Sequence, residues 1–288
     1  MPVASVVSAV PAHKLRIDML KERIITALIL LPIVLWCVFG AGDSSAFKAL
    51  AGALVLVGAW EWTALMKVEN LPGRVAFVAL VAAGVVTAAL PQAAPWHVPL
   101  YGLATGFWLI ALRMVTGFPD SSRYWSKGIV LLPMGLLLLI PAWSGLVDLH
   151  QASPWWLMYL FLLVWGADTG AYFAGRALGK NKLAPAVSPG KTIEGMIGGL
   201  LLTMIIMTAV GFYRELTPLR FAAFAGLSLL TVLASVLGDL LESMVKRQAG
   251  VKDSGNIFPG HGGALDRIDS LTAAAPVFAL GWALSGGF

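Results

Sequence analysis

Long runs of apolar residues, separated by short polar segments, make up most of the chain. A helix needs about 20 largely apolar residues to cross a bilayer, and most of the runs approach that length. We predict nine transmembrane helices, at residues 24–39, 46–66, 75–90, 98–115, 128–142, 155–174, 195–212, 219–238 and 270–284. The runs do not alternate in polarity as membrane β-barrel strands do. The predicted fold class is an all-α integral membrane protein, a polytopic bundle.

The distribution of Lys and Arg predicts the orientation of this bundle. Cytoplasmic loops of membrane proteins carry an excess of these residues. With nine crossings and a cytoplasmic N-terminus, only Lys48, Arg214 and Arg220 of the 20 Lys and Arg residues lie outside. Removing one helix would move every later loop to the other side and destroy this asymmetry. We therefore expect an N-in/C-out topology, with a cytoplasmic segment at 1–23 and a single transmembrane domain at 24–288.

The composition supports a membrane protein and limits its partners. Hydrophobic residues make up 58% of the chain and charged residues 12%, against about 45–50% and about 25% in soluble domains. Such a low share of charge excludes soluble enzymes and disordered proteins. The net charge is +5, but the positive residues sit where membrane topology requires them, so no nucleic-acid partner is predicted.

The second half of the chain carries two longer, charged segments on the predicted cytoplasmic side, at 175–194 and 246–269. Carboxylates also lie in or beside the apolar runs of this half, and a carboxylate at membrane depth is costly and usually functional. These acids are Asp168, Asp239, Glu242, Asp266 and Asp269. We expect the chemistry at the cytoplasmic ends of these helices, with the two segments as catalytic loops.

Helical spacing groups several of these residues on common faces. Intervals of four, three and four residues place four side chains on one face of a helix, and these are Ser235, Asp239, Glu242 and Lys246. Asp266 and Asp269, three residues apart, share a face for the same reason.

Clustered acids without cysteine and with a single nearby histidine favour a hard, oxygen-liganded cation such as Mg²⁺. We predict Asp239 and Asp266 as metal ligands, with Asp168 and Asp269 as further candidates. Ion pairing within the cluster, for instance of Glu242 with a lysine four residues away, is the alternative.

The segment 246–269 combines five glycines with early cations. Glycine lets a backbone approach a phosphate closely, and Lys and Arg supply the charge to hold it. His261, between two glycines, could bond a phosphate or transfer a proton, and a structural turn is the competing interpretation.

The segment 175–194 contains Ser188-Pro189-Gly190-Lys191-Thr192, which we interpret as a helix start with Ser188 as N-cap and Pro189 at the first helical position. A helix N-terminus beside a lysine binds anions. The segment is not a P-loop, because Pro185 stands where that motif needs its first glycine. Outside these segments, we interpret Glu61 as a buried, hydrogen-bonded helix residue, and Gly195-x-x-Gly198 as a site of close helix packing.

Specific motifs run through the second half. They are Trp165–Tyr172, Gly175-Arg176, Lys182-Leu183, Ser188–Gly195, Ser235–Glu242, Ser243–Arg247, Lys252-Asp253, Pro259–Gly263 and Leu265–Ser270. Together they resemble the phosphatidate cytidylyltransferase (CDP-diacylglycerol synthase) family, and Met19–Ile24 extends the resemblance weakly to the N-terminus. Two positions depart from the family pattern: Ala264, where a larger aliphatic residue is usual, and Gly190, where lysine is often found.

The resemblance implies that a cytidylyl group passes from CTP to phosphatidic acid, giving CDP-diacylglycerol and pyrophosphate. It also implies a requirement for Mg²⁺, with a second cation left open, and a bacterial inner membrane location with the active site facing the cytoplasm. We expect catalytic roles for Asp239, Asp266, Lys246, Arg267 and His261. We expect contacts to substrate phosphates from Lys191, Arg247, Ser188, Thr192 and Lys252.

Two other functions stay open from the sequence. One is a cytidylyltransferase for another lipid phosphate. The other is a cation-coupled transporter, which would need charged residues along a path through the whole membrane, whereas the acids here gather at one face. Membrane lipid is an expected partner, and a homodimer is one option for the assembly.

Overall fold

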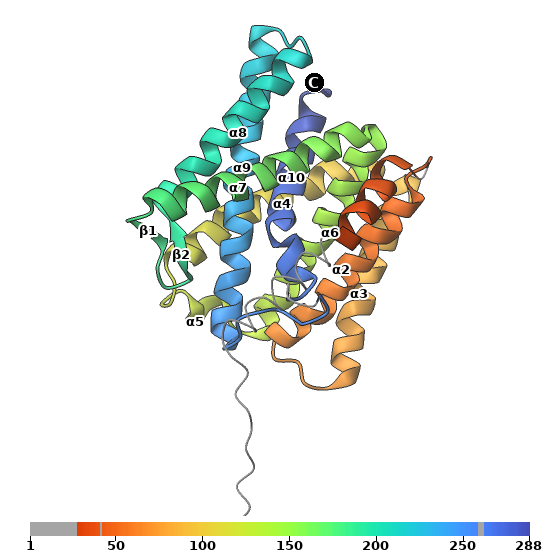
Figure 1. Ribbon diagram of the computed structural model, residues 1–288. Helices are drawn as coiled ribbons and strands as arrows, with labels where there is room; N and C mark the ends of the chain where they lie inside the picture. The colour runs from red at the N-terminus through yellow and green to blue at the C-terminus, as the bar shows by residue number, and fades with distance from the viewer. Residues whose placement is uncertain (1–27, 41, 259–261) are drawn as a thin grey trace, which may run out of the picture.

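The computed structural model describes residues 28–40, 42–258 and 262–288, and its elements are almost all helices (Figure 1). A short apolar helix, Leu28–Gly40, ends in the π-helical segment η1 (Trp36–Gly40). The α-helices that follow are α2 (Ser45–Leu65), α3 (Leu71–Ala89), α4 (Ala94–Thr116), α5 (Ser122–Trp125), α6 (Gly128–Ala152), α7 (Pro154–Leu178), α8 (Ile193–Tyr213), α9 (Pro218–Ala249) and α10 (Leu265–Leu284). The 3₁₀ segment η2 (Pro91–Ala93) precedes α4, and two short strands, β1 (Lys182–Ala184) and β2 (Ser188–Thr192), lie between α7 and α8.

Seven of these helices are long and apolar enough to cross a membrane: α2, α3, α4 with η2, α6, α7, α8 and α9. This confirms the all-α polytopic membrane class. The other two predicted spans also fall on helices where they are described, residues 28–39 on the short Leu28–Gly40 helix and 270–284 on α10. The number of nine crossings and their orientation stay predictions.

α10 lies in the middle of the helices (Figure 1), where it contacts α2, α4, α6, α7 and α9. Its residues 273–275 and Phe278 are fully buried. Its first two turns carry Asp266, Arg267 and Asp269. The central helix therefore brings charged side chains to one end of the core.

α9 continues well past the predicted span 219–238. Hydropathy falls at Asp239, but Leu240, Leu241, Met244 and Val245 are buried and keep the helix packed against its neighbours. The helix ends at Gly250, whose φ of +83° is the left-handed conformation that favours glycine at a helix C-terminus. The segment between α9 and α10 is consequently shorter than the predicted loop 246–269.

The prediction that Ser188–Thr192 starts a helix is wrong. This segment is strand β2, which pairs antiparallel with β1 in a register that joins Lys182 to Thr192 and Ala184 to Ser188. α8 begins at Ile193, and the Thr192 side chain caps it by accepting a bond from the Gly195 amide at 3.1 Å. The residue before a proline favours extended backbone, so Ser188 begins a strand. The hairpin is the one sheet among the described residues, which also hold an isolated antiparallel bridge between Phe258 and Gly262.

Glycines let the helices around the site approach closely. A Cβ at Gly170 of α7 would lie 2.5 Å from the Gly198 carbonyl oxygen of α8. A Cβ at Gly238 of α9 would lie 2.5 Å from the Asp269 carbonyl oxygen of α10. Backbone thus packs on backbone at both contacts, which confirms the expected close packing at Gly198 and brings the acids of α9 and α10 together.

Candidate active site

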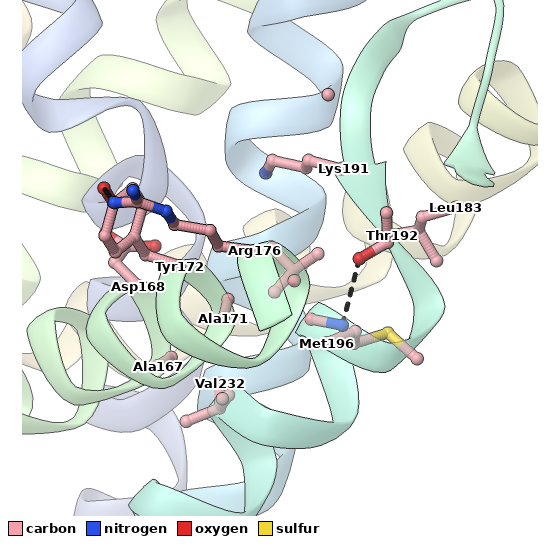
Figure 2. Close-up of a pocket in the computed structure, with 15 residues that line it drawn as sticks. Ala167, Asp168, Ala171, Tyr172, Arg176, Leu183, Lys191, Thr192, Met196 and Val232 are labelled. Atoms are coloured by element: carbon pink, nitrogen blue, oxygen red, sulfur yellow. Dashed lines mark hydrogen bonds between the residues drawn. The ribbon is translucent and has the colours of Figure 1, made fainter. Parts of the chain in front are cut away.

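A cavity of about 400 Å³ lies among α7, β2, α8 and α9. Most of its lining is apolar, and we call it the polar cavity because Asp168, Tyr172, Arg176, Lys191 and Thr192 bring polar side chains into it. One wall is a face of α7, where Asp168, Tyr172 and Arg176 recur at intervals of four residues. Lys191 and Thr192 line it from β2 (Figure 2). The Arg176 guanidinium donates to the Tyr172 hydroxyl at 3.0 Å. The hairpin and α7 thus supply two cations to one cavity, as a phosphate-binding site requires.

Lys191 joins this cavity to α9. Its Nζ lies 2.6 Å from Oδ2 of Asp239, and the Ser243 hydroxyl donates to Oδ1 of the same carboxylate at 3.1 Å. Asp168 lies within electrostatic range of Lys191, Asp239 and Arg267. The structure therefore brings Asp168 and Asp239 to the same place, with a lysine between the cavity and the Asp239 carboxylate.

A second cluster lies deeper, between α9 and α10. Lys246 is buried, and its ammonium group is 2.7 Å from Oε2 of Glu242 and 2.5 Å from Oδ1 of Asp266. Oε1 of Glu242 is buried and has no hydrogen-bond partner among the described residues. Asp269 lies within electrostatic range of Glu242, Asp239 and Lys246. The alternative of a Glu242–Lys246 ion pair is confirmed, and this cluster holds more carboxyl groups than cations.

The second oxygen of Asp266 binds the loop between α9 and α10. Oδ2 accepts hydrogen bonds from the Ser254 amide at 2.9 Å, the Ser254 hydroxyl at 2.9 Å and the Gly263 amide at 2.8 Å. Gly262 has φ +79° and closes this turn. Asp266 thus links Lys246 to the glycine-rich loop.

Glu61 of α2 reaches the same loop from the first half of the chain. It is 6% exposed, and it accepts hydrogen bonds from the Ser254 hydroxyl at 3.0 Å, the Ala264 amide at 3.0 Å and the Leu265 amide at 2.8 Å. Its interpretation as a buried, hydrogen-bonded residue is confirmed. Its place beside Asp266 was not predicted, because no local pattern links it to Ser254, 193 residues further along the chain.

The remaining predicted phosphate ligands lie in several environments. Arg247 donates from Nε to the Val187 carbonyl oxygen at 3.3 Å, which ties the end of α9 to the β1–β2 turn. The hydroxyl of the buried Thr192 is used as the cap of α8. Ser188 lies in β2, and Lys252 and Arg267 are exposed. His261 lies outside the described residues.

The predicted metal ligands divide between the two clusters. Asp239 and Asp168 lie beside Lys191, Asp266 faces Lys246, and Asp269 lies between the clusters. In the ranges that the structure describes, no three Asp, Glu, His or Cys side chains meet as a metal-binding group. The donor chemistry nevertheless fits Mg²⁺, since all donors are carboxylates and a buried oxygen of Glu242 has no hydrogen-bond partner in the part of the chain that the structure describes.

An apolar cavity of about 620 Å³ adjoins the polar one. It lies among α4, α9 and the β1–β2 hairpin, and its walls include Trp108, Leu233 and Leu237. Leu183, Met196 and Val236 line both cavities. A polar chamber and an apolar chamber therefore share a wall.

Comparison with known proteins gives the family. A model of the cytidylyltransferase family matches residues 21–284, a stretch that includes both acidic clusters, the hairpin and both cavities. The chain belongs to the cytidylyltransferase family. A phosphatidate cytidylyltransferase of Pseudomonas aeruginosa is 50% identical to it over 277 residues, covering 93% of this chain and 99% of the relative.

Two further relatives within this family carry the same name. The phosphatidate cytidylyltransferase of Haemophilus influenzae is 40% identical over 282 residues, covering 90% of this chain and 97% of the relative. That of Staphylococcus aureus is 34% identical over 266 residues, with the same coverage of both chains. The similarity therefore extends over the whole domain, including its first half with Glu61.

Proposed function

We propose that this chain transfers a cytidylyl group from CTP to phosphatidic acid, forming CDP-diacylglycerol and pyrophosphate. The names of its relatives support this reaction. The structural observation that carries it is the shared wall of the polar and apolar cavities. A lipid phosphate needs such a pair of chambers, one for its charged headgroup and one for its acyl chains.

In this reaction the protein mainly has to position the two substrates and neutralise the charge of their phosphates. A phosphate oxygen of phosphatidic acid attacks the α-phosphorus of CTP. The bond from that phosphorus to the oxygen bridging to the β-phosphorus breaks, and pyrophosphate leaves with the electron pair. Because the nucleophile is already anionic near neutral pH, no protein base is required. Correct alignment and a fixed positive environment supply the rate enhancement.

Lys191 and Arg176 are the cations proposed to hold phosphates in the polar cavity. Asp239 fixes Lys191 at 2.6 Å, so the lysine is held in place before a phosphate reaches it. Lys246 is fixed in the same way by Glu242 and Asp266. Arg247, Arg267, Lys252, Ser188, Thr192 and His261 stay candidates for further contacts to the substrates.

The acids are proposed to hold the metal that the family resemblance implies. Asp239 and Asp266 are the primary candidates, with Asp168 and Asp269 as additional ones and Glu242 supplying a buried oxygen that has no hydrogen-bond partner among the described residues. Bound Mg²⁺ would neutralise phosphate charge that the lysines alone leave unbalanced.

We further propose that the site faces the cytoplasm of a bacterial inner membrane, in a protein that crosses it nine times. The distribution of Lys and Arg supports this orientation. CTP would then enter the polar cavity from the cytoplasm, and phosphatidic acid would enter from the bilayer through the apolar cavity between α4 and α9.

Label transfer tests the proposed reaction. The purified protein in lipid vesicles receives CTP labelled at the α-phosphate, and the label in the organic phase is counted. We expect labelled lipid only when phosphatidic acid and Mg²⁺ are both present. Label that appears only with an isoprenoid phosphate would assign another lipid substrate. Cation flux into the vesicles without nucleotide, in the absence of any lipid labelling, would support the transporter instead.

A further inference from the structure

We propose that Glu61 is a positioning residue, which fixes the described parts of the loop between α9 and α10, around Ser254 and around Gly263, and thereby the carboxylate of Asp266. It lies on α2, far in sequence from the motifs that resemble the family. The kinetic effects expected of Glu61 variants rest on the proposed cytidylyl transfer, whereas the expected effects on the loop do not.

The contacts of Glu61 hold the start of α10 in place. Its carboxylate is buried, and a buried charge is tolerated only when hydrogen bonds compensate it. The Ala264 and Leu265 amides donate to it at 3.0 and 2.8 Å. These are the free amides at the start of α10, where the helix dipole favours negative charge. Glu61 therefore caps the central helix from another helix.

Two glycines of the loop leave the space that this carboxylate fills. A Cβ at Gly255 would lie 2.2 Å from Oε1 of Glu61, and one at Gly263 would lie 2.5 Å from both of its oxygens. Distances under about 3 Å are not accessible to a real Cβ, so a side chain at either position would force the loop or Glu61 to move. Glu61 thus explains the glycine at 255, and Glu61 together with the Ser254 hydroxyl, 2.3 Å from such a Cβ, explains the glycine at 263.

Ser254 connects Glu61 to Asp266. Its hydroxyl oxygen lies 3.0 Å from Oε2 of Glu61 and 2.9 Å from Oδ2 of Asp266. A hydroxyl has one proton to donate, so the two carboxylates share it. The Ser254 amide also donates to Asp266, at 2.9 Å. Movement of the loop away from Glu61 would therefore change the position of Asp266.

Glu61 lines neither cavity, so it acts through Asp266 and not on a substrate. This predicts a specific kinetic result for Glu61→Gln, which keeps the size of the side chain but loses its charge. We expect kcat to fall roughly ten- to a hundred-fold, the effect of weakening charge-assisted hydrogen bonds. The KM for CTP should change less than about two-fold, because substrate contacts are intact. Glu61→Asp keeps the charge and should recover part of kcat.

A protease measures the loop independently of activity. Trypsin should cleave after the exposed Lys252 several times faster in Glu61→Gln than in the wild type, while cleavage after the exposed Lys127 stays unchanged. Glu69→Gln, at an exposed glutamate on the loop that follows α2, is the matched control and should change neither kcat nor cleavage.

The glycine contact gives a test that does not depend on how well Glu61 variants fold. Gly255→Ala should impair activity and speed cleavage after Lys252 in the wild type. In a Glu61→Ala background the same change should add little, because the colliding carboxylate is gone. The proposal would be overturned if Gly255→Ala in the wild type changed neither activity nor cleavage after Lys252. It would also be overturned if the effects of Gly255→Ala and Glu61→Ala on activity were fully additive.

The activity assay and the trypsin assay together distinguish a failure of this proposal from a failure of the proposed reaction. If the wild type transfers no cytidylyl group, the reaction is wrong, and cleavage after Lys252 still reports whether Glu61 holds the loop. If the wild type is active and Glu61→Gln matches it in kcat and in cleavage, the reaction stands and Glu61 has no positioning role.

Discussion

Replacing Lys191 by alanine tests the phosphate-binding role of the polar cavity most sharply. Lys191 lines the cavity and pairs with Asp239 at 2.6 Å. A charge-assisted contact to a phosphate is worth about 1.5–3 kcal/mol, roughly one to two decades in kcat/KM. The Lys191 side chain is 27% exposed, so solvent screening puts the expected loss near the lower end, roughly ten- to thirty-fold.

The assay is the initial rate of label transfer from CTP at varied concentrations of CTP and phosphatidic acid. KM should rise for the substrate whose phosphate Lys191 contacts, with a smaller change in kcat, because the contact is present in the ground state and the transition state alike. Lys180→Ala is the matched control, since this exposed lysine of the same segment lies outside the lining of the cavity. Wild-type kcat/KM for both substrates in Lys191→Ala would refute the reasoning.

Two further predictions concern the fold. In Gly170→Leu the new side chain would collide with the Gly198 carbonyl, so thermal unfolding in detergent should occur at lower temperature and activity should be lost. Gly226→Leu, where a Cβ meets nothing within 4 Å, should change neither, and equal behaviour of the two variants would contradict the backbone contact. Reporter fusions should place segment 175–194 in the cytoplasm and the C-terminus outside, and a cytoplasmic C-terminus would contradict nine crossings.

Local sequence patterns predicted much of the fold. Transmembrane segments depend on the hydropathy of a single stretch, and each predicted span, as far as the structure describes it, falls on a helix. The common face of Asp239, Glu242 and Lys246 followed from helical spacing, and the structure shows Lys246 paired with Glu242 four residues away. The strand at Ser188–Thr192 was missed because a Ser-Pro pair is compatible with both a helix start and an extended segment.

Contacts between distant segments could not be predicted in the same way. Nothing near Glu61 in the sequence indicates that its carboxylate receives the amides of Ala264 and Leu265. Nor does spacing reveal that Lys191 and Lys246 face Asp239 and Asp266 respectively, since strand β2 and helices α9 and α10 meet only through tertiary packing. The acids were found because charge in an apolar run is conspicuous, but their partners are set by the fold.

The central claim is that Asp239 and Asp266 are required for cytidylyl transfer. The activity of Asp239→Asn and Asp266→Asn tests this claim most directly. Asn is nearly isosteric with Asp and removes only the charge, so both variants should insert into the membrane at wild-type levels. Label transfer from CTP to phosphatidic acid should fall by several orders of magnitude in each. The double variant should be little worse, because residues that act as a unit are not additive. A near wild-type rate in either variant, over the full range of Mg²⁺ concentrations, would contradict the account.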